Sequence, residues 1–209
     1  MVNAIRLLIA DDQALVRGGL AALLNLEPDL EVVAEAGRHD EVLPAVRAHR
    51  PDVCLLDIEM PGAFAGVSDG IDVAALLARE EPQVRSLIVT TFGRPGYLRR
   101  AMESGAAGFV VKDTPAAELA EAVRKVHAGQ HVVDPVLATE SLAGGANPLT
   151  AREQEILRVA LRGAPVAEIA AAVHLSQGTV RNYLSSAIAK TATANRIEAA
   201  RAAQRHGWM

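Results

Sequence analysis

The sequence predicts an α/β fold, a doubly wound sheet of five parallel strands, followed by a small all-α helix-turn-helix domain. Short apolar runs alternate with amphipathic helical segments in the first part of the chain, which is typical of parallel α/β sheets. After residue 147 the apolar period becomes helical throughout. With 209 residues and 50% hydrophobic content, the chain is long enough for two domains. We expect a first domain over residues 1–128, a linker over 129–147 and a second domain over 148–209.

Four apolar runs of the first domain each end in a residue that phosphoryl chemistry can use. They are Ile5–Ala10 before Asp11 and Asp12, Val53–Leu56 before Asp57, Leu87–Val89 before Thr90, and Phe109–Val111 before Lys112. Because the C-terminal ends of parallel strands meet at one edge of a sheet, these polar side chains are expected to share one crevice. Three carboxylates, a hydroxyl and an ammonium group predict a site that phosphorylates an aspartate.

The clustered carboxylates need a cation, because two unit charges about 4 Å apart repel by roughly 4 kcal/mol at an effective dielectric constant near 20. Mg²⁺ suits an oxygen-only site and bridges to phosphate oxygens. We expect Asp57 to be the nucleophile that forms an acyl phosphate. Lys112 then supplies positive charge for the phosphoryl oxygens, and Thr90 supplies a rotatable hydroxyl.

Each of these residues alone has a simpler interpretation. Asp11 or Asp12 can cap the helix that follows, Lys112 can be a solvated surface charge, and Thr90 can be an ordinary strand residue. Asp57 is harder to explain in this way, because a carboxylate at the end of a buried run needs a partner. The four together favour the phosphoacceptor site.

The second domain shows the start signals of three successive helices. Thr150 and Glu153 form a capping box, Pro165 opens the second helix, and Ser176 caps a third that runs from Gln177 to Lys190. The expected buried positions are Ile156, Leu157, Ala160, Val166, Ile169, Ala170, Val173, Val180, Leu184 and Ile188. The third helix therefore presents its polar side chains outward: Thr179, Arg181, Asn182, Ser185 and Ser186.

The second and third of these helices, with a turn at residues 174–175, fit a helix-turn-helix whose last helix enters the DNA major groove. Arg181 and Asn182 can reach base edges, whereas Lys190, Arg196 and Arg201 are candidates for phosphate contacts. Residues 148–209 carry eight Arg or Lys against four Glu, while the rest of the chain is acidic. This contrast predicts that only the C-terminal part binds a polyanion. A solvated polar face is the simpler alternative.

The segments IADDQ, LLDIEMPG, IVTTF and GFVVKD resemble the receiver domain of bacterial two-component response regulators, which has a CheY/flavodoxin-like fold. The resemblance implies that Asp57 is the phosphoacceptor and that Thr90 and Lys112 contact the phosphoryl group. It also implies an aromatic switch at Phe109 and the Mg²⁺ ligands Asp11, Asp12, Asp57 and the main-chain carbonyl of Glu59. The loop after Asp57 is longer than usual, with an apparent insertion from Ala63 to Asp69.

The segments NPLTAREQEIL, VAEIAAAVHLSQGTVRNYLSSAIAK and NRIEA resemble the LuxR-type DNA-binding domain. The whole chain is similar to NarL/FixJ response regulators, nearest the DesR-like subgroup. This resemblance implies a transcriptional regulator and not a turnover enzyme. The implied partners are a sensor histidine kinase, promoter DNA and, on phosphorylation, a second copy of the chain.

We expect the phosphoryl group to draw Thr90 and Lys112 toward its oxygens and Phe109 inward, and we expect Phe92 to slow hydrolysis of the acyl phosphate. No apolar run approaches the ~20 residues of a transmembrane helix. A cytoplasmic protein without membrane insertion is therefore expected. One alternative is a DNA-binding regulator that does not depend on phosphorylation and keeps the receiver as a scaffold. The other is a magnesium-dependent phosphatase, which would gain nothing from a basic helical tail.

Overall fold

The computed structural model describes residues 4–91, 95–134, 137–139 and 147–209. The chain divides into two compact units, one reaching to Ala138 and the other running from Thr139 to Met209, apart from a short stretch at the start of α4 that groups with the second. Each unit has its own hydrophobic core. Among the described residues, no helix is long and apolar enough to span a membrane.

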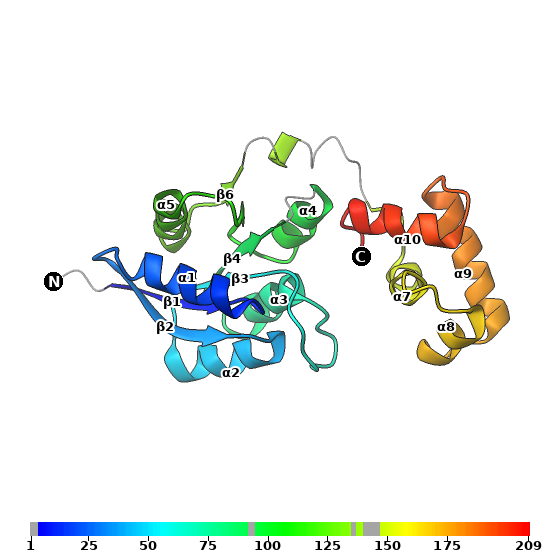
Figure 1. Ribbon diagram of the computed structural model, residues 1–209, viewed down its shortest axis with the longest axis horizontal. Helices are drawn as coiled ribbons and strands as arrows, with labels where there is room; N and C mark the ends of the chain where they lie inside the picture. The colour runs from blue at the N-terminus through cyan, green and yellow to red at the C-terminus, as the bar shows by residue number, and fades with distance from the viewer. Residues whose placement is uncertain (1–3, 92–94, 135–136, 140–146) are drawn as a thin grey trace. The chain divides into compact units, whose positions relative to one another are not determined.

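The first unit is built on one parallel sheet, drawn in blue to green in Figure 1. Its strand order is β2-β1-β3-β4-β5-β6, so the chain winds in both directions from β1. The strands are β1 (Ile5–Ala10), β2 (Leu30–Ala36), β3 (Val53–Leu56), β4 (Arg85–Thr90), β5 (Gly108–Val111) and β6 (Val132–Val133). Strand β3 is buried along its whole length, as expected for a central strand that helices cover on both faces.

Helices cover both faces of this sheet. They are α1 (Ala14–Leu24), α2 (His39–His49), α3 (Gly70–Glu80), α4 (Pro95–Glu103) and α5 (Ala116–His127). Helix α1 packs beside α5 and α2 packs beside α3, on opposite sides of the strands (Figure 1). One core cluster joins Leu24 of α1 and Val123 of α5 to Leu7, Leu55 and other strand residues.

The predicted fold class is confirmed, and the structure adds one strand to the five expected. Strand β6 pairs in parallel with β5, with Gly108 opposite Val132 and Phe109 opposite Val133. These two valines lie in the segment that the sequence assigned to the linker. A strand of two residues is too short to show the alternation by which strands are recognised. The sequence also predicts a short helical turn near residues 136–142, most of which lies outside the described residues.

The second unit is all helical, with α7 (Ala151–Ala160), α8 (Val166–Ala172), α9 (Gln177–Lys190) and α10 (Arg196–Arg205). The predicted capping box at Thr150 and Glu153 is present, and Ser176 caps α9. Between α8 and α9, His174 takes a left-handed conformation with φ of 53°. This conformation turns the chain sharply, so that α8 and α9 form the predicted helix-turn-helix.

Candidate functional site

The polar residues at the C-terminal strand ends lie together at one edge of the sheet. Asp11 follows β1, Asp57 follows β3, Thr90 ends β4 and Lys112 follows β5. Parallel registers hold these ends level, and the backbone N–H of Lys112 donates to the carbonyl of Thr90 at 2.8 Å. Asp11, Asp57 and Thr90 are all buried. The sheet topology therefore brings into one crevice residues that are far apart in the sequence.

Lys112 lies between two carboxylates. Its Nζ is 2.7 Å from Oδ2 of Asp11 and 3.0 Å from Oδ2 of Asp57. The Lys112 side chain is 10% exposed, so water screens these ion pairs only weakly. The ammonium group partly compensates the negative charge of the two carboxylates. Its position also allows it to bind the oxygens of a group attached to Asp57.

Asp57 is held by one hydrogen bond of its backbone and one of its side chain. Its N–H donates to the carbonyl of Ala10 at 2.9 Å, and its Oδ1 accepts from the N–H of Ile58 at 2.8 Å. Burial raises the pKa of Asp57, and the nearby Asp11 carboxylate adds to this, whereas Lys112 opposes it. A further cation beside the carboxylates would favour the ionised form, which is the nucleophilic one.

Asp11, Asp12 and Asp57 form an acidic cluster with the composition of a metal site. Each offers one carboxylate oxygen, and these oxygens lie within 4.8 Å of one another. Asp12 is exposed, whereas Oδ2 of Asp11 is buried and pairs with the Lys112 ammonium at 2.7 Å. Gln13, not an aspartate, is the N-cap residue of α1, and no side chain caps that helix. Oδ1 of Asp11 accepts from the N–H of Gln13 at 2.9 Å, so Asp11 binds the residue before α1 without capping the helix.

The remaining predicted residues of the receiver site lie at different depths. Glu59 is exposed, two residues after Asp57. Phe109 is fully buried, with no exposed surface. Its movement on phosphorylation, as the expected aromatic switch, stays a prediction. Phe92 lies outside the described residues.

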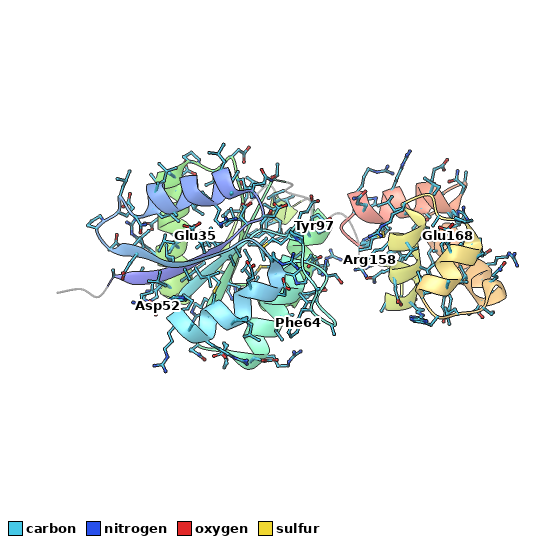
Figure 2. All side chains as sticks on the ribbon, turned by 60° about the horizontal axis from the view of Figure 1, so that its bottom comes forward. Glu35, Asp52, Phe64, Tyr97, Arg158 and Glu168 are labelled. Atoms are coloured by element: carbon cyan, nitrogen blue, oxygen red, sulfur yellow. The ribbon has the colours of Figure 1, made fainter. Side chains whose placement is uncertain are left out.

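The long loop after Asp57 has a defined shape. Phe64 and Val67 form an isolated antiparallel bridge, and the N–H of Val67 donates to the carbonyl of Phe64 at 3.1 Å. Gly66, with φ of 80°, supplies the left-handed residue of this turn. Phe64 is 44% exposed at the turn and can be located in Figure 2. The insertion therefore folds back on itself before α3 begins.

In the second unit, α9 presents most of the predicted DNA-contacting residues to solvent. Arg181, Asn182 and Ser185 are exposed, and Arg196 at the start of α10 is half-buried. The hydroxyl of Thr179 is hydrogen-bonded to Oγ of Ser176, 2.8 Å away, so it belongs to the cap of α9. The buried face of the helix contains Val180, Leu184 and Ala187.

Glu153 binds two residues that the sequence pattern assigned to the outer surface. Oγ of Ser186 donates to Oε1 of Glu153 at 2.6 Å, and Nζ of Lys190 donates to Oε2 at 2.7 Å. Ser186 is therefore not outward-facing as predicted, because α7 packs against that side of α9. The Lys190 side chain keeps 34% exposure, but its charge is paired with a carboxylate that is 3% exposed. Helical periodicity shows which residues share a face, but not which helix packs on it.

Although burial alone would raise it, the pKa of Glu153 falls to about 2, because Lys190, Ser186 and Thr150 all stabilise its charged form. The capping box was the one signal in the sequence that marked Glu153. Its second role, to position α9 against α7, comes from the packing of two helices. The acid thus stabilises both the start of α7 and the orientation of α9.

Comparison with known proteins finds a matching family model for each of the two units. The family model "Response regulator receiver domain" matches residues 7–124, and "Bacterial regulatory proteins, luxR family" matches residues 147–203. Over 205 residues the chain is 45% identical to the uncharacterized transcriptional regulatory protein YvfU of Bacillus subtilis (strain 168), covering 98% of this chain and 100% of that protein. It is 41% identical over 204 residues to the transcriptional regulatory protein DesR of the same organism, covering 98% of each.

Solved structures show the same architecture. The crystal structure of the response regulator ChrA, from a heme-sensing two component system, matches with a TM-score of 0.58 and 31% identity, covering 99% of this chain and 100% of that one. The similarity to the DesR-like subgroup is confirmed, and the relatives are transcriptional regulatory proteins, not turnover enzymes. The chain belongs to the response regulators that join a receiver domain to a LuxR-type DNA-binding domain.

Proposed function

We propose that Asp57 accepts a phosphoryl group and that the resulting acyl phosphate switches the protein into a dimer that binds promoter DNA. The observation that carries this proposal is the position of the Lys112 ammonium, within 3.0 Å of both Asp11 and Asp57 at the C-terminal edge of the sheet. A carboxylate with a buried ammonium beside it and a hydroxyl on the neighbouring strand can hold a phosphoryl group by charge-assisted hydrogen bonds.

In the proposed reaction, one carboxylate oxygen of Asp57 attacks the phosphorus atom of the donor. A new O–P bond forms, the bond from phosphorus to the leaving group breaks, and the leaving group keeps the bonding electrons. Lys112 then pairs with a phosphoryl oxygen instead of with the free carboxylate. Thr90, which ends the adjacent strand β4, orients its hydroxyl toward another oxygen.

We propose that Mg²⁺ is held by Asp11, Asp12, Asp57 and the main-chain carbonyl of Glu59. The donor set fits, because Asp11, Asp12 and Asp57 each offer a carboxylate oxygen and these oxygens lie within 4.8 Å of one another. When bound, the ion neutralises the charge of the carboxylates and of the incoming phosphoryl oxygens. The protein's own contribution is to keep these oxygens on rigid strand ends.

For the output, we propose that α9 enters the major groove of promoter DNA. Arg181 and Asn182 are exposed and offer bidentate hydrogen bonds to guanine and adenine edges. Thr179 and Ser185 are further contacts from the same helix. Arg196 contacts phosphates, and Lys190 does so only in addition to its ion pair with Glu153. A short recognition helix gives limited affinity, which is why a two-fold dimer on paired half-sites is part of the proposal.

The phosphoryl donor in this proposal is a sensor histidine kinase, and both phosphotransfer and DNA binding take place in the cytoplasm. We also propose the division into receiver (1–128), linker (129–147) and DNA-binding domain (148–209), in which strand β6 of the linker segment pairs with the receiver sheet.

The proposal is tested with acetyl phosphate and Mg²⁺ on the full chain. We expect wild-type protein to become labelled, to sediment as a dimer and to bind its promoter more tightly, whereas Asp57→Asn does none of these. If Asp57→Asn controlled the promoter as wild type does, the regulator would be phosphorylation-independent. Sustained release of phosphate from small phosphomonoesters would instead identify a phosphatase.

A further inference from the structure

The first residue of helix α3 packs against the backbone of the proposed phosphoacceptor, Asp57. The N–H of Gly70, the first residue of α3, donates to the carbonyl of Ile58 at 3.0 Å. A Cβ atom at Gly70 would lie only 1.8 Å from the carbonyl oxygen of Asp57. The start of α3 is therefore fixed in position relative to Asp57, even though a long loop separates the two in sequence.

Arg100 ties α4 to this same end of α3. Its Nη1 donates to Oδ2 of Asp69 at 2.6 Å, and its Nη2 donates to Oδ1 of Asp69 at 2.9 Å and to Oδ1 of Asp72 at 2.6 Å. Asp69 is the N-cap of α3, and its Oδ1 also accepts from the N–H groups of Ile71 and Asp72. The guanidinium thus binds the cap and the first turn of α3 together.

These contacts are shielded and directional. The side chain of Arg100 is 21% exposed, that of Asp69 18% and that of Asp72 29%. A two-pronged guanidinium–carboxylate pair has a fixed geometry, so it stabilises one placement of the two helices and is lost when they shift. By contrast, Arg47 of α2 pairs with Glu80 and Glu81 at the other end of α3 and is 55% exposed.

Arg100 therefore connects two helices, α3 and α4, each of which starts near a residue of the proposed phosphorylation site. Helix α3 begins at Gly70, which lies against the backbone of Asp57, and α4 is the helix that follows Thr90, the last residue of β4. In the proposed switch Thr90 moves toward the phosphoryl oxygens. Helix α4 is the next element of the chain after Thr90, so we propose that it moves as well. The Arg100 contacts and the Lys112–Asp57 ion pair are formed in the same structure.

We infer that Arg100 is a positioning residue that, by locking α4 to the first turn of α3, holds the receiver in the arrangement in which Lys112 pairs with the Asp57 carboxylate. The inference rests on the proposed phosphorylation of Asp57. It implies that loss of the lock raises the population of the arrangement that accepts the phosphoryl group. Arg100 contacts neither Asp57 nor Lys112 in any hydrogen bond or ion pair found among the described residues.

The test compares Arg100→Gln with Arg47→Gln, which removes ion pairs at the opposite end of the same helix. The full chains are incubated with acetyl phosphate and Mg²⁺, and the rate of labelling is measured, together with the dimer fraction before phosphodonor is added. We expect Arg100→Gln to be labelled roughly five to thirty times faster than wild type, the size of a typical coupling between sites. Its unphosphorylated dimer fraction should rise, and Arg47→Gln should match wild type.

Two conservative variants separate the lock from a general loss of folding. Arg100→Lys keeps the charge without the fork and should lie between wild type and Arg100→Gln. Asp72→Asn leaves the cap residue Asp69 in place and should also speed labelling. In the double variant Arg100→Gln with Asp72→Asn, labelling should be no faster than in Arg100→Gln alone, because both changes break the same contact.

Labelling of Arg100→Gln at the wild-type rate, or more slowly, overturns the lock while leaving the phosphorylation of Asp57 intact. Absence of labelling in wild type as well overturns the proposed function, and the lock with it. The two failures are thus told apart by the wild-type measurement.

Discussion

Lys112 Nζ donates a hydrogen bond to Asp57 Oδ2 at 3.0 Å, although the two residues are 55 positions apart and their strands, β5 and β3, are separated by β4. The same ammonium lies 2.7 Å from Asp11 beside β1. The side chain of Lys112 therefore connects the ends of three strands, β1, β3 and β5. A change of charge on Asp57 would therefore also affect the pairing of Lys112 with Asp11.

Removal of this ammonium should prevent efficient phosphorylation. In Lys112→Ala, two buried carboxylates lose their cation and the phosphoryl oxygens lose a donor, so labelling by acetyl phosphate should slow by about a hundredfold. Lys112→Arg, which keeps the charge in a different shape, should retain part of the rate. Wild-type labelling of Lys112→Ala would show that the ammonium plays no part in the reaction.

The stability of the C-terminal unit should depend on pH through Glu153. Its pKa in the folded protein, about 2, is below the ordinary 4.5, so the folded state binds the proton less tightly than the unfolded state does. The stabilisation is thus complete above pH 4.5 and is lost as the pH falls toward 2; its size is about 3 kcal/mol.

Urea unfolding followed by the fluorescence of Trp208, the single tryptophan of the chain, measures this effect in the second unit. Glu153→Gln is the matched variant, since it keeps the shape but not the charge. The difference in unfolding free energy between wild type and Glu153→Gln should be largest near neutral pH and shrink below pH 4.5. A difference that stays constant with pH would rule out the charged pair as its source.

Arg181 and Arg196 should affect DNA binding in different ways. Arg181→Ala removes a contact proposed to read a base, so it should cost about 1–3 kcal/mol on the promoter and little on unrelated DNA. Arg196→Ala removes a phosphate contact and should weaken both, with a shallower salt dependence. Fluorescence anisotropy of the phosphorylated chain at two salt concentrations compares them. Equal weakening on both DNAs by Arg181→Ala would contradict base reading.

Gly70 should tolerate no side chain. A Cβ atom there would lie 1.8 Å from the carbonyl oxygen of Asp57, so Gly70→Ala must displace either α3 or the acceptor backbone and should cost about 2 kcal/mol or more. Gly19→Ala is the control, because no atom lies within 4 Å of its added Cβ in α1. The control should gain roughly 0.5–1 kcal/mol from helix propensity. Thermal unfolding measures both, and an unaffected Gly70→Ala would contradict the close approach.

Much of the fold follows from local patterns. The four apolar runs that end in polar residues predicted the strands β1, β3, β4 and β5, and the capping signals at Thr150 and Ser176 predicted the starts of α7 and α9. These patterns are local because burial of a strand and capping of a helix depend on a few consecutive residues. The proximity of Asp11, Asp57 and Lys112 followed from one further rule, that parallel strands end at one edge.

Other features depend on which elements pack together, and no short pattern contains that information. The resemblance marked Phe109 as an aromatic switch, but only the structure shows that the core encloses its ring. Ser186 and Lys190 looked like surface residues of α9, but Glu153 of α7 binds both. Arg100 carried no signal at all until α4 was placed beside the cap of α3.

The amino-acid sequence by itself determined the order of the elements and the identity of the acids, hydroxyl and amine that end the strands. Only the tertiary structure decided which charges pair across elements, because a hydrogen bond or an ion pair requires contact within about 3 Å. Such contact depends on how helices pack on the sheet and on each other, which is set by the whole core and not by any one segment.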